Sequence, residues 1–138
     1  MPVAVALLPA DERGFPVPFF APLKNGRPVF AASDPVKRRQ CATQRLCWIC
    51  GQPLFDLLAF IGGERSVENR VFADAAMHVE CAEYSVRVCP FIADPNYKRR
   101  AFEHLGEALP GMVPEKPERF AVLIARDFRV LRFTSGEW

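Results

Sequence analysis

Two pairs of potential metal ligands, each with two residues between its members, constrain this chain more than any other sequence feature. Cys47 and Cys50 form the first pair, and His78 and Cys81 form the second. Structural zinc takes four sulfur or nitrogen ligands in a tetrahedron, usually from two such pairs. Gly51 lets the backbone curl, and residues three apart share one face of a helix. We therefore predict one structural zinc ion on these four side chains.

A knuckle carrying two ligands, a hairpin, and a helix carrying two more make the arrangement called a treble clef. The sequence thus predicts an α+β fold, with small sheets and about three helices around a treble-clef-like zinc knuckle. A chain of 138 residues suits a single domain. We expect N-terminal strands in residues 1–33, the zinc-binding core in 34–91, and a helix with a terminal hairpin in 92–138.

Apolar runs, turn signals and helix starts place the expected elements along the chain. Asp34-Pro35 and Asp94-Pro95 combine an N-cap residue with proline at the first helical position, so a helix should follow each. Lys24-Asn25-Gly26 signals a turn. The predicted helices span about 34–46, 76–89 and 94–109. The predicted strands or extended segments are 3–8, 15–20 and 29–32, a hairpin of 54–61 with 67–73 turning at Gly62-Gly63, and a terminal hairpin of 120–125 with 128–133.

The remaining two of the five cysteines are expected to be buried thiols that pack as small hydrophobes. Cys89 would lie about 16 Å along an unbroken helix from His78, too far to share its ion. Cys41 lies one to two turns before Cys47 and stays an alternative ligand.

A Cys-x-x-Cys pair without an export signal favours a reducing cytoplasm. No apolar run approaches transmembrane length, so a membrane partner is not expected.

A site with four protein ligands leaves no open position for an activated water, which favours a structural ion over a catalytic one. His78-Val79-Glu80 has the form seen in zinc deaminases, but the Cys-x-x-Cys pair precedes it instead of following it. An HNH-like metal-dependent nuclease is the enzyme alternative. Such an enzyme needs a histidine base on the hairpin, and no histidine lies between Cys50 and His78.

The surface suggests two kinds of macromolecular partner. Aromatic side chains in residues 15–20 and at Trp48 could anchor a protein, although such residues also fill small cores. Two basic clusters follow the helix starts, where backbone amides assist phosphate binding. A formal net charge of +2 favours separate solvated faces over a nucleic-acid patch. We therefore favour a protein partner and keep nucleic acid as the alternative, with these candidate contacts: Lys37, Arg38, Arg39, Lys98, Arg99 and Arg100.

Several strings in order resemble a group of uncharacterised zinc-knuckle proteins from bacteria and their phages. They are Arg13-Gly14-Phe15-Pro16-Val17-Pro18, Gly26-Arg27-Pro28-Val29-Phe30, Leu46-Cys47-Trp48-Ile49-Cys50-Gly51, Ala59-Phe60-Ile61-Gly62, Asn69-Arg70, Met77-His78, Cys81-Ala82-Glu83-Tyr84 and Cys89-Pro90-Phe91. The resemblance spans roughly residues 13 to 100 and departs from the group in residues 63–76. It implies a zinc knuckle and brings no activity with it. A phage origin would suggest an inhibitor of a host or defence protein, acting in the host cytoplasm.

Overall fold

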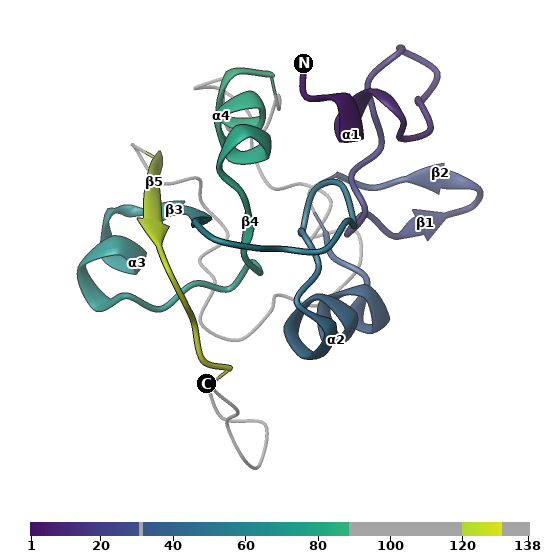
Figure 1. The fold of residues 1–138 in the computed structure, drawn as a ribbon. Helices are drawn as coiled ribbons and strands as arrows, with labels where there is room; N and C mark the ends of the chain where they lie inside the picture. Colours follow the sequence, from purple (N-terminus) through teal and green to yellow (C-terminus); the bar gives the residue numbers. More distant parts are fainter. Residues whose placement is uncertain (31, 89–119, 131–138) are drawn as a thin grey trace.

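The computed structural model describes residues 1–30, 32–88 and 120–130. Within them the predicted α+β class is confirmed, with four helices and two small antiparallel sheets (Figure 1). The helices are α1 (Val3–Ala6), α2 (Pro35–Gln44), α3 (Glu64–Asn69) and α4 (Val79–Val88). The strands are β1 (Leu23–Lys24), β2 (Arg27–Pro28), β3 (Leu58–Gly63), β4 (Met77–His78) and β5 (Phe120–Ala125).

The larger sheet has the order β4-β3-β5, and both of its strand pairs are antiparallel. Its central strand β3 is apolar and is buried from Leu58 to Ile61. Successive strand residues point to opposite faces, and the core divides accordingly. Ala59 and Ile61 belong to the main cluster with the knuckle and α4, whereas Leu58 and Phe60 pack with Phe72 and other side chains. β3 is thus the central strand against which the segments that carry the metal ligands pack.

The predicted partner of β3 is wrong. Residues 67–73 were expected to form the second strand of a hairpin, but α3 occupies 64–69 and β3 pairs instead with β5. Gly62 and Gly63 are not the turn but the last residues of β3, opposite Ala121 and Phe120. A side chain at Gly62 would meet the Phe72 ring at 2.8 Å. Glycine is needed there because that ring packs directly on the strand.

The predicted N-terminal strand at residues 3–8 is also wrong, because Val3–Ala6 is a short helix. The carbonyl of Pro2 accepts hydrogen bonds from the amides of Val5 and Ala6. A strand would instead need a partner strand to satisfy its backbone. Val5 is buried at 1% exposure and fixes this turn to the main core.

The turn at Asn25-Gly26 is confirmed, since both residues adopt left-handed backbone angles and Lys24 pairs with Arg27 across them. The second strand lies at Arg27–Pro28, just before the predicted 29–32. Residues 15–20 form no regular strand, apart from an isolated bridge between Pro16 and Ala10. Residues 128–130 are likewise not a strand. The predicted helix at 94–109 and residues 131–133 lie outside the described residues.

The start of α2 is confirmed. Asp34 is the N-cap, its carboxylate accepts hydrogen bonds from the amides of Val36 and Lys37, and Pro35 is the first helical residue.

We expect Asp34→Ala to lower the free energy of unfolding by about 1 kcal/mol, because the amides of Val36 and Lys37 would lose their acceptor. Urea denaturation would measure this. Asp34→Asn, which keeps an acceptor oxygen, should retain most of the stability, and equal losses in both variants would contradict the cap.

No helix within residues 1–30, 32–88 and 120–130 is long and apolar enough to cross a bilayer.

Candidate metal centre

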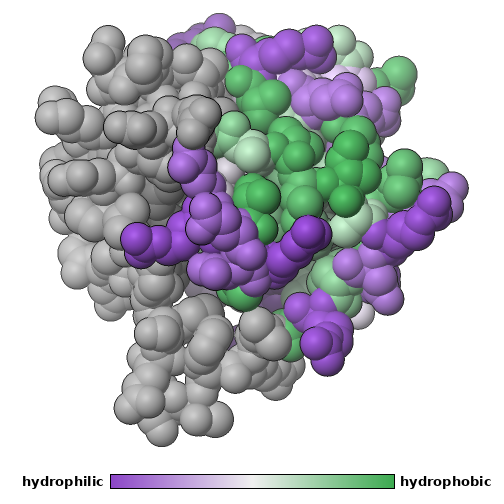
Figure 2. Space-filling view, turned by 90° about the vertical axis from the view of Figure 1, so that its left-hand side faces the viewer, coloured by the Kyte–Doolittle hydropathy of each residue, from purple (hydrophilic) through white to green (hydrophobic). Residues whose placement is uncertain are grey.

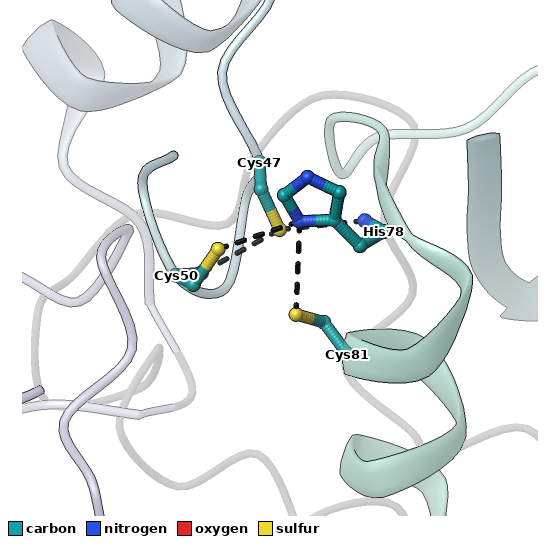
Figure 3. Close-up of side chains that lie close together, drawn as sticks. All are labelled: Cys47, Cys50, His78 and Cys81. Carbon is teal, nitrogen blue, oxygen red and sulfur yellow. Dashed lines mark hydrogen bonds between the residues drawn. The ribbon is translucent and has the colours of Figure 1, made fainter. Parts of the chain in front are cut away.

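The structure brings the four predicted ligands together. The ligand atoms of Cys47, Cys50, His78 and Cys81 all lie within 4.8 Å of one another (Figure 3). The His78 Nδ1 atom is 3.4 Å from Cys50 Sγ and 3.8 Å from Cys81 Sγ. Figure 3 shows the three sulfur atoms turned toward this nitrogen, from segments far apart in sequence.

The first pair lies on a tight knuckle. An isolated bridge joins Leu46 to Pro53, and the Cys47 amide donates to the Gln52 carbonyl at 2.8 Å. Inside this loop the Gly51 amide donates to the Cys47 carbonyl at 2.9 Å. Gly51 has a φ of +77°, a left-handed angle that glycine adopts without strain. The curl expected from the sequence is therefore present, and it presents both thiols to the same point.

The second pair is placed differently from the prediction. The helix was expected to begin near Ala76 and to carry both ligands, but α4 begins at Val79 and His78 is the last residue of β4. The register pairs His78 with Leu58 of β3. Only Cys81 lies in the first helical turn. The sheet therefore holds one ligand of this pair and the helix holds the other.

Hydrogen bonds orient the imidazole of His78. Its Nε2–H donates to the Pro53 carbonyl at 2.9 Å. A carbonyl oxygen can only accept, so Nε2 carries a proton in this contact, and Nδ1 is the ring nitrogen that faces the sulfur atoms. A backbone carbonyl on the outer nitrogen is the usual way in which proteins fix the tautomer of a metal-binding histidine. This contact comes from the knuckle itself, so the loop that carries the first pair also orients the third ligand.

The donor set fits a four-coordinate metal ion. A tetrahedral ion with bonds of about 2.0–2.3 Å needs ligand atoms about 3.5–3.8 Å apart. The two distances from His78 Nδ1 to the sulfur atoms, 3.4 and 3.8 Å, agree with this spacing. Three thiols and one imidazole are soft or borderline donors, which select transition metals over magnesium or calcium. The four residues could therefore hold a metal ion.

The sulfur atoms perturb one another strongly. Hydrogen bonds from the Cys50 and Cys81 thiols, with further ones from the amides of Cys50 and His78, lower the pKa of Cys47 to about 3. The pKa of Cys81 is raised, because its thiol forms hydrogen bonds with Cys47 and with Cys50 and because it is buried. The protein therefore favours one thiolate, and negative charge on all three sulfur atoms requires a cation among them.

Cys41 does not join the four ligands. It is buried at 1% exposure in α2 and packs in the same core cluster as Cys47 and Cys50. Burial, with a smaller contribution from Cys47, raises the pKa of the Cys41 thiol to about 12. Cys41 is thus a neutral core thiol, as expected. Cys89 lies outside the described residues.

Two contacts that the sequence does not reveal connect the halves of the site. The amide of Trp48, inside the knuckle, donates to the Ala76 carbonyl at 3.0 Å, next to β4. Arg38 of α2 donates to the Ala73 carbonyl and to Ser33 Oγ, and its guanidinium lies 5.5 Å from the centre of the Trp48 ring. The Trp48–Ala76 and Arg38–Ala73 hydrogen bonds join residues far apart in sequence, so no local pattern could have indicated them.

Two of the three basic residues of α2, Lys37 and Arg38, contact other side chains or backbone groups of the protein. Arg38 is engaged as described, and the Lys37 ammonium lies 4.1 Å from the centre of the Phe19 ring. Arg39 is exposed. The Asp34 carboxylate accepts hydrogen bonds from the amides of Val36 and Lys37. Backbone amides at this helix start had been expected to assist in binding a phosphate.

The proposed phosphate contacts stay a prediction, and Lys98, Arg99 and Arg100 lie outside the described residues. Trp48 is 2% exposed and stacks on Phe20 with ring centres 4.7 Å apart, so it belongs to the core.

No family model, no curated protein and no solved structure matches this chain.

Proposed function

We propose that this protein is a non-catalytic binding module whose core is held together by one zinc ion on Cys47, Cys50, His78 and Cys81. The observation that carries the proposal is the convergence of three buried thiols and one oriented imidazole on one point. Zinc is the ion we propose, because a Cys3His set in a closed site is typical of structural zinc.

Four protein ligands argue for a structural role. A catalytic zinc keeps one position for water or substrate, whereas here every position of a tetrahedron has a protein donor. The three cysteines are also 0–4% exposed, so a substrate could not reach the ion from their side. An HNH-like nuclease would need a histidine base besides the ligands. His78 is engaged on both ring nitrogens, by Pro53 and by the sulfur atoms.

A protein partner is the favoured class. Figure 2 shows an apolar area bordered by hydrophilic residues, on the side of the molecule where α3, β3 and β5 lie. On β5, the apolar side chain of Ile124 stays 51% exposed. Apolar areas with a polar border are typical of protein-binding surfaces. The resemblance to phage and bacterial zinc-knuckle proteins supports a host or defence protein as the partner.

Nucleic acid remains the alternative partner, and salt dependence separates the two. Binding to phosphates releases counterions, so affinity falls steeply with salt. We expect weak retention of the full chain on heparin, with little effect of Arg39→Ala. Strong retention that collapses with salt and with that variant would favour the alternative.

The test of the proposal compares two purified baits in a bacterial lysate, the native chain and Ile124→Glu. The substitution places a charge at an exposed apolar position and leaves the four ligands intact. Elemental analysis should give one zinc per chain for both baits. A protein retained by the native chain and lost with Ile124→Glu supports the binding role, and it should then bind directly when purified. Absence of zinc from the native chain would refute the structural part of the proposal.

A further inference from the structure

The four ligands differ in their access to solvent. Cys47 and Cys81 are 0% exposed and Cys50 is 4% exposed, so protein covers all three sulfur atoms. His78 is the one ligand of the four that is partly exposed. Figure 3 shows its Nδ1 edge directed at the sulfur atoms, with the rest of the ring extending away from them. An incoming ligand from solution therefore meets the imidazole before it meets any sulfur atom.

Residues 53–57, here named the cover loop, hold the outer side of that imidazole. The Pro53 carbonyl accepts the Nε2–H at 2.9 Å. The Phe55 ring packs on the imidazole edge-to-face, with ring centres 5.8 Å apart. The loop is fixed at both ends, by the Leu46–Pro53 bridge with the Leu54-to-Arg45 hydrogen bond and by the start of β3 at Leu58.

Phe55 is an unusual residue to find here. Its side chain is 74% exposed, so it adds little to the core, yet its ring lies against a ligand. The next residue, Asp56, has a left-handed φ of +60°. Aspartate tolerates this conformation in tight turns, so the chain turns directly after Phe55. Core packing does not explain the position of this ring, whereas covering the imidazole does.

We propose that the metal enters and leaves the site through His78, and that Phe55 controls the rate by covering the imidazole. This inference rests on the proposed zinc site. The incoming ligand is a small chelating molecule. It displaces the imidazole first, because the sulfur atoms lie beneath the protein. Phe55 is thus a positioning residue that holds His78 on the ion.

The experiment measures transfer of zinc from the full chain to an excess of the chromogenic chelator 4-(2-pyridylazo)resorcinol by stopped flow. Phe55 contributes an edge-to-face ring contact to the imidazole, and the outer hydrogen bond comes from Pro53. We expect Phe55→Ala to speed the transfer about two- to tenfold, the size of effect typical of losing one aromatic contact. Phe55→Tyr keeps the ring and should behave like the native chain. Leu57→Ala removes an exposed apolar side chain of the same loop and should leave the rate unchanged.

The outcomes distinguish this inference from the proposed function. If the native chain holds no zinc before the chelator is added, the zinc site itself is refuted. If it holds one zinc and all four proteins release it at the same rate, the site stands and the role of Phe55 is refuted. An equal acceleration in Phe55→Ala and Leu57→Ala would point to general loosening of the loop and would also overturn the proposal. Circular dichroism of each loaded variant checks that the fold is intact.

Discussion

Cys47→Ala is expected to unfold the core of this protein. The Cys47 sulfur accepts hydrogen bonds from the amides of Cys50 and His78, and it is one of the four ligands. A structural zinc ion contributes on the order of 10 kcal/mol to folding. The whole stability of a domain is about 5–15 kcal/mol. Loss of the ion therefore removes most or all of the stability, and the near-ultraviolet circular dichroism of the buried Trp48 should collapse.

Cys41→Ala is the matched control, because it removes the same thiol from an equally buried position outside the cluster. It should keep one zinc per chain and a cooperative melting transition. Its loss of stability should be about 1 kcal/mol, the value for removing a small buried group. Treating the native chain with excess EDTA should reproduce the effect of Cys47→Ala. A Cys47→Ala protein that melts cooperatively at the native temperature would show that the ion does not hold the fold.

Gly51→Ala is expected to have the second largest effect. A Cβ atom at this position would lie 2.6 Å from Cδ1 and 3.0 Å from Cγ of the Phe19 ring. That ring cannot move freely, since Phe19 packs on the main core and its amide donates to the Ile49 carbonyl at 2.7 Å. The left-handed angle costs about 1–2 kcal/mol for alanine, and overpacking adds about 1–3 kcal/mol. We expect a total loss of about 2–5 kcal/mol by urea denaturation.

Gly26→Ala separates the two contributions. Gly26 has nearly the same φ, +78° against +77°, but nothing lies within 4 Å of its Cβ position. Its loss should therefore be confined to the backbone, about 1–2 kcal/mol. The excess loss in Gly51→Ala then measures the contact with Phe19. Equal losses in the two variants would mean that the ring does not pack against the knuckle. Gly51→Ala should also weaken zinc binding, because the curl of the knuckle places Cys47 and Cys50.

Local features of this protein could be predicted because their causes lie within a few residues. Asp34 caps the helix that follows it, and Asn25-Gly26 makes the turn between β1 and β2. The two ligand pairs are also local features. The spacing of Cys47 with Cys50, and of His78 with Cys81, was enough to predict a metal site. Residues 67–73 were mispredicted for the complementary reason. Their apolar residues suggested a strand, but residues 64–69 form α3, and within the part of the chain that the structure describes no strand pairs with 67–73. Phe72 instead packs its side chain against β3.

The sequence by itself determined which four side chains meet, because metal chemistry restricts both the kinds of ligand and their spacing. The tertiary structure decided how they are held. One partner strand of β3 comes from residues 120–125, and His78 is placed by the pairing of β4 with β3 instead of by helical spacing. Arg38 and the Pro53 carbonyl join the two halves over long sequence distances. Such contacts depend on which surfaces bury one another when the chain closes, and short-range patterns carry no information about that choice.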